Sequence, residues 1–245
     1  MKGSEISHVG LLAHSTEGAA LSFLTFTGEG GKRLGEFGHP QITLDCAPLA
    51  ASMPHYDSGN LLAVRAIMTD SIARLANAGA DFFFCPDNTV HQALELGEPD
   101  FAIPGLHIAE VVANAAVLSG FHKVGILGTR YLMQSRVYPD ACERRNLAWQ
   151  VPSQENQQVV HDVIFGELLD GIVRPESGLK IASIMDEFVQ DGCDVIALVC
   201  TELPMLSSVT AWPVSTLDSN RLISIAALDA ALRGDLPTWR GGVVR

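Results

Sequence analysis

Short apolar segments alternate along the chain with longer amphipathic segments. The short segments are rich in Val, Ile, Leu and Phe and favour β-strands, whereas the long ones repeat apolar residues at helical spacing and favour α-helices. Because continuous apolar strands between helices are typical of a parallel sheet covered on both faces, the pattern predicts an α/β fold. The predicted strands are 8–13, 41–45, 81–86, 123–128 and 194–200, and the clearest helices are 61–79, 108–120 and 179–192.

The chain also repeats part of its own sequence. The segment VGLL at 9–12 resembles VGIL at 124–127, an offset of 115 residues. GADFFFCPD, which starts at Gly79, resembles GCDVIALVC, which starts at Gly192, an offset of 113 residues. Two matches in the same order and at nearly the same offset indicate two similar halves.

We therefore predict two similar domains, each a doubly wound parallel sheet of the flavodoxin-like kind. The first covers residues 1–104 plus 215–245, and the second covers residues 105–214. A last helix, from about residue 220 to 233, is expected to pack back against the first domain.

The repeat indicates which residues end the two matching strands. Asp87 lies eight residues after Gly79, as Cys200 does after Gly192. Ligands of open parallel sheets lie outside the carboxyl ends of the strands, and we expect both residues there. Side chains alternate along a strand that rises about 3.3 Å per residue. Cys85 is therefore expected about 6–7 Å deeper than Asp87, inside the core.

Composition narrows the class of protein. The chain has 245 residues, of which 47% are hydrophobic and 18% charged, so it has material for a substantial core. No apolar run reaches the roughly 18–20 residues that span a bilayer, and the start of the chain has no signal-peptide pattern, so we expect a cytoplasmic protein. The net charge of −12 argues against nucleic-acid or membrane partners. Five cysteines without a C-x-x-C pair and scattered histidines give no metal site.

Two motifs, DNTVH at 87–91 and CTELP at 200–204, carry a resemblance to the aspartate/glutamate racemase family, including its hydantoin-racemase and arylmalonate-decarboxylase relatives. Members usually carry Cys-Asn-Thr-x-His after one strand and Cys-Thr-Glu-Leu-Pro after another. The second motif is intact here, and Asp87 stands at the usual cysteine of the first. Further similarity over 103–110, 124–138, 151–160 and 217–221 extends the resemblance to nearly the whole chain.

The resemblance implies two α/β domains with the active site in the cleft between them, commonly in a homodimer. It implies a small carboxylate-bearing substrate and chemistry without pyridoxal phosphate or another cofactor. The chain departs from the family pattern at Ala13-His14, where members often have Gly-Gly, and at Leu132, where threonine is frequent. Some relatives have threonine at the Asp87 position, and the decarboxylases also lack that cysteine.

Racemisation at a carbon α to a carboxylate needs one acid/base group on each face of that carbon. Two cysteines suit this task because their reference pKa, about 8.5, lies near neutrality. Aspartate, with a reference pKa of about 3.9, is a weak base unless its surroundings raise that value. We expect Asp87 to act as a base and Cys200 as an acid. The alternatives are a helix cap for Asp87 and a small buried hydrophobe for Cys200.

The neighbouring polar residues are candidates for binding and orienting a substrate. Hydroxyl and amide groups at helix starts can hold a carboxylate, although each could also be a plain cap. Glu202 and His91 are expected to orient or tune the site, and His91 could equally be a satisfied core histidine. The predicted substrate-binding residues are Ser15, Thr16, Asn88, Thr89, Thr201 and Arg174, the last either as a cation for an acidic side chain or as a solvated loop arginine.

Three functions are consistent with these residues. The first is a cofactor-independent racemase or epimerase, with aspartate or glutamate as the first substrates to test. The second is a decarboxylase or other lyase in which Cys200 protonates the carbanion left after loss of CO2, so that no second cysteine is required. The third is a binding protein that kept the pocket without the chemistry.

Overall fold

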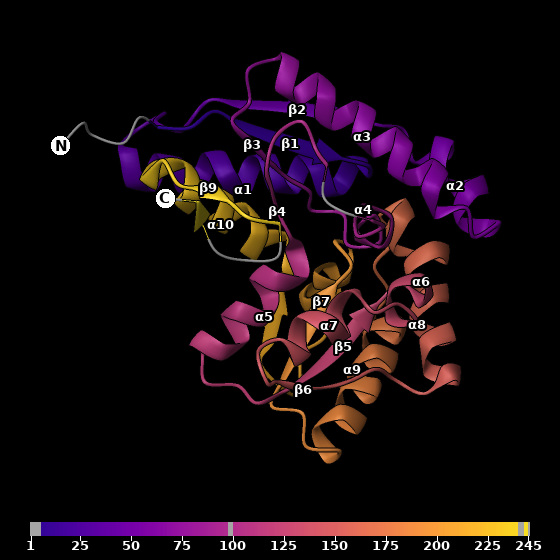
Figure 1. Ribbon diagram of the computed structural model, residues 1–245. Helices are drawn as coiled ribbons and strands as arrows, with labels where there is room; N and C mark the ends of the chain where they lie inside the picture. Colours follow the sequence, from indigo (N-terminus) through magenta and orange to yellow (C-terminus); the bar gives the residue numbers. More distant parts are fainter. Residues whose placement is uncertain (1–5, 98–99, 240–242, 245) are drawn as a thin grey trace. The chain divides into compact units, whose positions relative to one another are not determined.

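The computed structural model describes residues 6–97, 100–239 and 243–244 (Figure 1). The chain divides into two compact units. The first unit is Met1–Val111 with Asn220–Arg245, and the second is Val112–Ser219. The domain boundaries expected from the sequence fell at 104/105 and 214/215.

A four-stranded parallel sheet in the order β2-β1-β3-β4 is the centre of the first unit. Its strands are β1 (Val9–Ala13), β2 (Ile42–Cys46), β3 (Phe82–Phe84) and β4 (Gly105–Leu106). Its helices are α1 (Thr16–Leu34), α2 (Leu49–Asp57), α3 (Leu61–Asn77) and α4 (His91–Leu94), with α10 (Ser219–Arg233) added from the end of the chain. A short antiparallel pair, β9 (Leu236–Pro237) and β10 (Val243–Val244), follows α10.

Alternate side chains of this sheet enter two separate cores. On one face, Phe82 and Phe84 of β3 pack with α1 and with α10. The last helix therefore returns to the first unit, as expected (Figure 1). On the other face, Phe83 and then Cys85 pack against α3 and α4. Cys85 is fully buried, so its predicted place in the core is confirmed. Apolar residues on both faces explain why these strands read as continuous apolar runs.

The second unit repeats this arrangement with the strand order β6-β5-β7-β8. Its strands are β5 (Lys123–Gly128), β6 (Ala148–Gln150), β7 (Val195–Val199) and β8 (Thr216–Asp218). Its helices are α6 (Arg130–Met133), α7 (Val137–Glu143), α8 (Gln154–Gly166), α9 (Pro175–Gln190) and two 3-10 turns, Leu168–Asp170 and Leu203–Ser208. A further helix, α5 (Ile108–Leu118), begins in the first unit and ends in the second.

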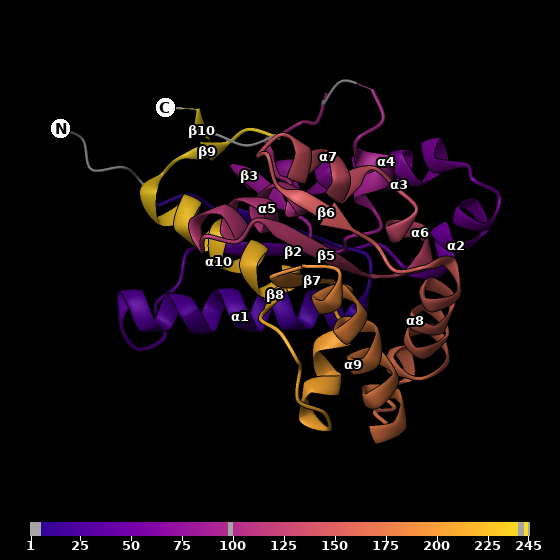
Figure 2. The same ribbon diagram turned by 90° about the horizontal axis from the view of Figure 1, so that it is seen from below.

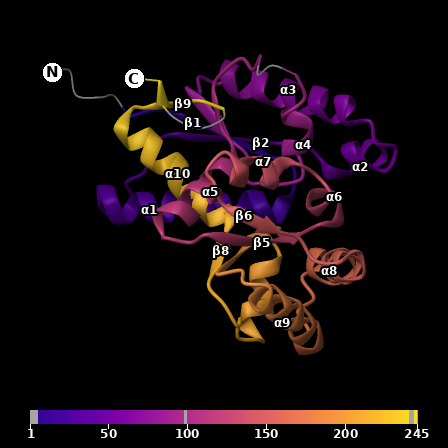
Figure 3. The ribbon, with the colours of Figure 1, turned by 60° about the horizontal axis from the view of Figure 1, so that its bottom comes forward.

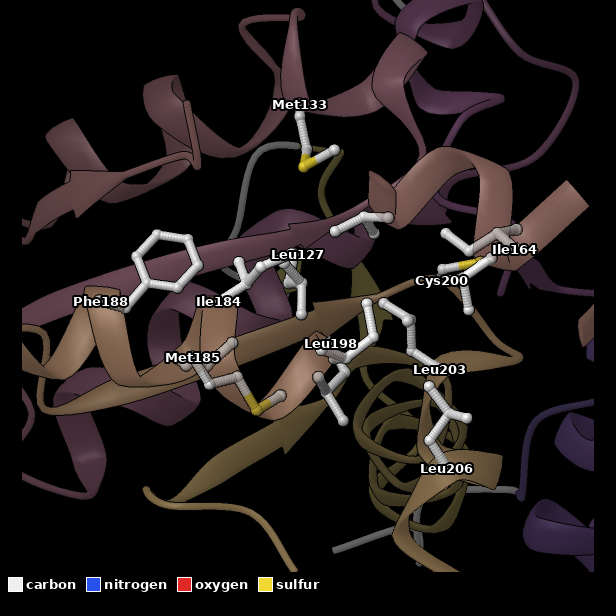
Figure 4. Close-up of a cluster of buried hydrophobic side chains, with 14 of the residues drawn as sticks. Leu127, Met133, Ile164, Ile184, Met185, Phe188, Leu198, Cys200, Leu203 and Leu206 are labelled. Atoms are coloured by element: carbon white, nitrogen blue, oxygen red, sulfur yellow. The ribbon is translucent and has the colours of Figure 1, made fainter. Parts of the chain in front are cut away.

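Helices α8 and α9 lie side by side and cover one face of the second sheet (Figures 2 and 3). The core beneath them joins side chains of β5 and β7 to apolar residues of both helices and of the turn after β7 (Figure 4). Ile196, Leu198 and Cys200 contribute to this core from alternate positions, so Cys200 continues the inward-facing row of β7.

The predicted fold class is confirmed, because both units are parallel four-stranded sheets with flanking helices in the same strand order. In each unit the second and third strands along the chain lie on opposite sides of the first, which is the flavodoxin-like order. The five predicted strands correspond to β1, β2, β3, β5 and β7, each shifted by at most two residues at either end.

Candidate active site

In the first unit, Asp87 lies just beyond the carboxyl end of β3 and is partly exposed. Its carboxylate accepts hydrogen bonds from the backbone N–H groups of Thr89 and Val90, so it caps the turn that leads into α4. Burial raises the pKa of the Asp87 carboxyl, while a charged His14 and the two N–H groups lower it, and the balance leaves the pKa above its usual range. The side chain is therefore both a cap and a better base than an ordinary aspartate.

His91 fixes the backbone of this turn through a hydrogen bond to Asp87. Its Nδ1 donates to the carbonyl oxygen of Asp87 at 2.9 Å, and its Nε2 accepts from the N–H of Ile108 at 3.3 Å. A carbonyl only accepts and a backbone N–H only donates, which fixes the neutral tautomer with the proton on Nδ1. Burial, reinforced by the nearby His107, lowers the pKa of His91 to about 3. His91 is thus a neutral residue that positions Asp87.

Two aromatic side chains, Trp239 and His107, pack against His91. The Trp239 ring stacks on His91 with centroids 5.6 Å apart and planes 4° apart. His107 meets His91 at 4.8 Å, edge to face, and its Nε2 lies 2.8 Å from Oε1 of Glu95. This packing leaves His91 little freedom, and the Asp87 carbonyl is held with it.

The other candidates of the first unit lie at the same edge of the sheet. Ser15 follows β1 and is the N-cap of α1, where its hydroxyl accepts from the N–H of Gly18 at 3.2 Å. Thr16 is the first residue of α1 and is exposed. Asn88 is buried and Thr89 is partly exposed in the turn after Asp87. Because β1 and β3 are neighbouring parallel strands, their carboxyl ends bring these residues and Asp87 together.

Several residues of this edge are not among the predicted site residues. His14 follows β1 directly and is 2% exposed, and Tyr56 of α2 has its ring centroid 6.5 Å from that of His14. Burial and the charge of Asp87 raise the pKa of Tyr56 and of Cys46, which ends β2. His14 lies one residue before the predicted Ser15-Thr16 turn. That position is the sequence signal that could have placed His14 in the predicted site.

In the second unit, Cys200 directly follows β7 and is 7% exposed. Its thiol donates a hydrogen bond to Oε2 of Glu202 at 3.0 Å. Glu202 is itself buried, and Thr201 between the two is partly exposed. A thiolate at this place would stand 3.0 Å from a carboxylate oxygen, so like-charge repulsion favours the protonated thiol while Glu202 is ionised. The arrangement suits Cys200 to donate a proton.

Arg174 lies in the segment before α9, at the N-cap position of that helix. Its Nη1 pairs with Oε1 of Glu167 at 3.7 Å, and its side chain is 57% exposed. The hydroxyl of Ser177 donates to the other oxygen of Glu167 at 2.7 Å. Arg174 is therefore engaged with Glu167 rather than with residues 200–202.

Within the described ranges, no three His, Cys, Asp or Glu side chains converge as a metal-binding group. None of the helices in those ranges is both long and apolar enough to cross a membrane. What the two edges offer is acid/base chemistry: a carboxylate with a raised pKa in the first unit and a thiol beside a carboxylate in the second.

Comparisons with known proteins identify the family of the chain. The family model described as "Asp/Glu/Hydantoin racemase" matches residues 33–224. A curated relative, an uncharacterized protein from the region 3′ of pnlA in Pectobacterium carotovorum subsp. carotovorum, is 28% identical over 101 residues. That match covers 41% of this chain and 66% of the relative.

Solved structures share the fold. One, from Yersinia pestis and named for the Asp/Glu racemases, superposes with a TM-score of 0.84 at 24% identity, covering 92% of this chain and 99% of the other. An aspartate racemase homologue from Pyrococcus horikoshii OT3 gives a TM-score of 0.76 at 21% identity, covering 92% and 99%. Since the family model matches far more than half of the residues, the chain belongs to the Asp/Glu/hydantoin racemase family.

Proposed function

We propose that the protein is a cofactor-independent isomerase that racemises or epimerises the carbon α to a carboxylate. An acidic amino acid, aspartate or glutamate, is the first substrate to test. The observation that supports this most is positional: each unit presents one acid/base group just after the third strand of its sheet along the chain, Asp87 in the first unit and Cys200 in the second. We propose that both groups act on one substrate carbon, one from each face.

Asp87 is proposed as the base. It takes the proton of the Cα–H bond, and the carbon keeps the electron pair as a carbanion that the adjacent carboxylate stabilises. Cys200 then returns a proton to the opposite face, and Glu202 positions the thiol through its hydrogen bond. The raised pKa of Asp87 supports the first step, because a base works best when its pKa approaches the operating pH.

Substrate binding is proposed for the hydroxyl and N–H groups around these two residues. Ser15, Thr16, Asn88 and Thr89 in the first unit, and Thr201 in the second, would hold the substrate carboxylate and amino group. Arg174 is proposed for the side-chain carboxylate of an acidic substrate. That role would require the substrate to replace Glu167 as the partner of the guanidinium.

Deuterium wash-in in D2O with L- and D-aspartate and L- and D-glutamate tests the proposal. We expect solvent deuterium at Cα and gradual loss of optical rotation with at least one of the four. Folded protein that exchanges no deuterium into any of them would contradict the substrate assignment.

Matched variants test the residue roles. Cys200→Ala and Asp87→Asn are each expected to lower exchange by about 100-fold or more, which is the usual contribution of one acid/base group. Cys193→Ala removes another buried thiol, at the amino end of the same strand β7, and Cys85→Ala removes the core thiol beneath Asp87. Both controls should retain exchange, whereas a Cys200→Ala protein with full turnover would refute the site.

A second candidate, decarboxylation, is favoured by the hydrogen bond between Cys200 and Glu202. A single thiol held as a proton donor can protonate a carbanion that forms when CO2 leaves, and Asp87 then needs no role as a base. Release of CO2 from substituted malonates, with no exchange into amino acids, would replace the first proposal by this one. Thermal stabilisation by these ligands without turnover of either kind would indicate a binding protein.

The resemblance to the family also leads us to propose a cytoplasmic homodimer. Light scattering coupled to size-exclusion chromatography measures the mass of the particle directly. A mass twice that of the 26.2 kDa chain is expected, and a mass equal to one chain would contradict the dimer.

A further inference from the structure

His14 and Asp87 lie level with each other at the carboxyl ends of neighbouring strands. The parallel register of β1 and β3 pairs Leu11 with Phe84, and three further residues along each strand lead to His14 and Asp87. Neighbouring parallel strands are about 4.8 Å apart, so the two side chains start from adjacent points of the same edge. Their electrostatic interaction agrees with this closeness, since a charged His14 lowers the pKa of Asp87.

One ring nitrogen of His14 makes a hydrogen bond, and the other makes none to the residues that the structure describes. Its Nδ1 lies 3.1 Å from the carbonyl oxygen of Ala47, which can only accept, so Nδ1 carries the proton and Nε2 carries the lone pair. Nε2 is buried and has no hydrogen-bond partner among the residues that the structure describes. Buried polar atoms without a partner are rare, and an explanation in terms of function is warranted.

In the second unit, the residue at the position equivalent to His14 is Thr129, and its role is structural. There, β5 and β7 pair Gly128 with Val199, which sets Thr129 level with Cys200. The Thr129 hydroxyl caps α6 by accepting from the N–H of Leu132. In the first unit the cap is provided by the next residue, Ser15, so His14 has no capping role.

The other titratable side chains around Asp87 are poor partners for its proton. Burial and the charge of Asp87 raise the pKa of Tyr56, Cys46 and Cys85. All three therefore stay protonated and neutral at pH 7, and none has a free lone pair basic enough to take a proton from a carboxylic acid. His14 is the neighbour that has a buried ring nitrogen with a lone pair to accept that proton.

We propose that His14 and Asp87 form one proton-transfer unit, in which Nε2 of His14 holds the proton that Asp87 removes from the substrate. The inference rests on the proposed function and deepens it. The Cα–H bond breaks, its electron pair stays on carbon, and the proton forms an O–H bond on Asp87. That O–H bond then breaks as the proton passes to the Nε2 lone pair through one bridging water, because Nε2 makes no hydrogen bond to the described residues, Asp87 included. This regenerates the carboxylate and leaves an imidazolium. The reverse sequence returns a proton to the carbon, so the pair replaces the single cysteine usual at position 87.

His14→Asn tests the pair, because its amide can still donate to the carbonyl of Ala47 but has no atom at the place of Nε2. We expect deuterium exchange at neutral pH to fall about 100-fold, mainly in kcat. Asp87→Asn should fall similarly, and the double variant should be no slower than the slower single variant, because the two residues act as a unit. His8→Asn, at the amino end of the same strand region, is the matched control and should keep wild-type exchange. Wild-type exchange in His14→Asn, or multiplicative losses in the double variant, would overturn the proposal.

Imidazole NMR tests the pair independently of turnover. In 1H–15N spectra we expect neutral His14 to carry its proton on Nδ1, and its Nε2 resonance to shift in Asp87→Asn, because the neighbouring carboxylate is lost. An Nε2 resonance that is unchanged in Asp87→Asn would overturn the pair, whatever the activity. If the wild-type protein exchanges no deuterium into any substrate but this resonance shifts, the proposed function fails while the coupling of His14 to Asp87 stands.

Discussion

Lowering the pH should destabilise the first unit through one residue, His91. The buried imidazole has a pKa of about 3 in the folded protein, because burial and the neighbouring His107 disfavour its charged form. The hydrogen bond to the Asp87 carbonyl and the charge of Glu95 oppose this shift but do not overcome it. In the unfolded chain the same residue titrates near 6.5. The unfolded state therefore binds a proton first, and stability is lost as the pH falls below about 6.5.

The size of this effect follows from the difference between the two pKa values. Each pH unit between them is worth about 1.4 kcal/mol. Between pH 7.5 and pH 5.0, about 1.5 units lie below the unfolded-state value, so His91 should remove about 2 kcal/mol of unfolding free energy. The loss would continue to about 5 kcal/mol near pH 3, where the folded residue itself begins to take a proton.

Trp239 is suited to report this change, because its ring stacks on His91. With Trp149 and Trp212 replaced by Phe, urea unfolding followed by tryptophan fluorescence reads the first unit alone. The free energy of unfolding is measured from pH 7.5 to pH 5.0 in this background, with and without His91→Gln. His55→Gln, a partly exposed histidine of α2, is the matched control.

We expect the His91→Gln variant to lose about 2 kcal/mol less than its parent over this range, whatever its stability at pH 7.5. The contributions of other titrating groups cancel in the difference between the two proteins. The same pH dependence in both proteins, or a His91 resonance of the folded parent that titrates above pH 5, would show that His91 does not cause the loss of stability.

Two further predictions concern packing and thiol reactivity. Gly105→Ala should destabilise the first unit by about 1–3 kcal/mol in the same urea titration, because the new Cβ would lie 2.4 Å from Cζ of the buried Phe83. The control, Gly28→Ala, changes an exposed helical position with open space around it and should stabilise the first unit by up to about 1 kcal/mol. Glu202→Gln should speed alkylation of Cys200 by iodoacetamide about tenfold or more, since two charges 3.0 Å apart repel by about 1.4 kcal/mol even in water; an unchanged rate would show that the carboxylate does not control the thiol.

Much of the fold was accessible from the sequence because its signals are local. Continuous apolar runs indicated the strands, and the spacing of apolar residues indicated α3, α5 and α9. The repeat also distinguished Cys85 from Asp87, and the structure confirms that Cys85 is core. The long helix α1 carries no such signal. Its sequence contains glycines and several of its apolar residues are exposed, so packing rather than propensity determines it.

The contacts of the candidate site were less accessible, because they depend on which strands are neighbours. His14 and Asp87 are 73 residues apart, and only the pairing of β1 with β3 sets them level. The tautomer of His91 likewise depends on Ile108, which follows β4, a strand of only two residues. The pairing of Arg174 with Glu167 depends on how the segment before α9 folds back on the turn after α8. No sequence motif indicates these contacts.

Asp87 and Cys200 differ in chemistry, and thermodynamics limits what that difference can do in the proposed racemisation. Enantiomers of one amino acid have equal free energies in water, so kcat/KM must be the same in both directions of a racemisation, whichever groups transfer the proton. If an aspartate–histidine pair and a thiol act on one carbon, as proposed, they can therefore make kcat and KM unequal between the enantiomers but cannot favour one of them at equilibrium. Replacement of the usual cysteine by Asp87 is thus compatible with racemisation, provided that the carboxylate is basic enough. Burial provides this basicity by raising the pKa of Asp87, and in the proposed pair the lone pair of His14 then holds the proton that Asp87 has removed. A decarboxylase needs neither of them, because a single proton donor suffices once CO2 has left, so the burial of His14 beside Asp87 is the feature that favours the isomerase.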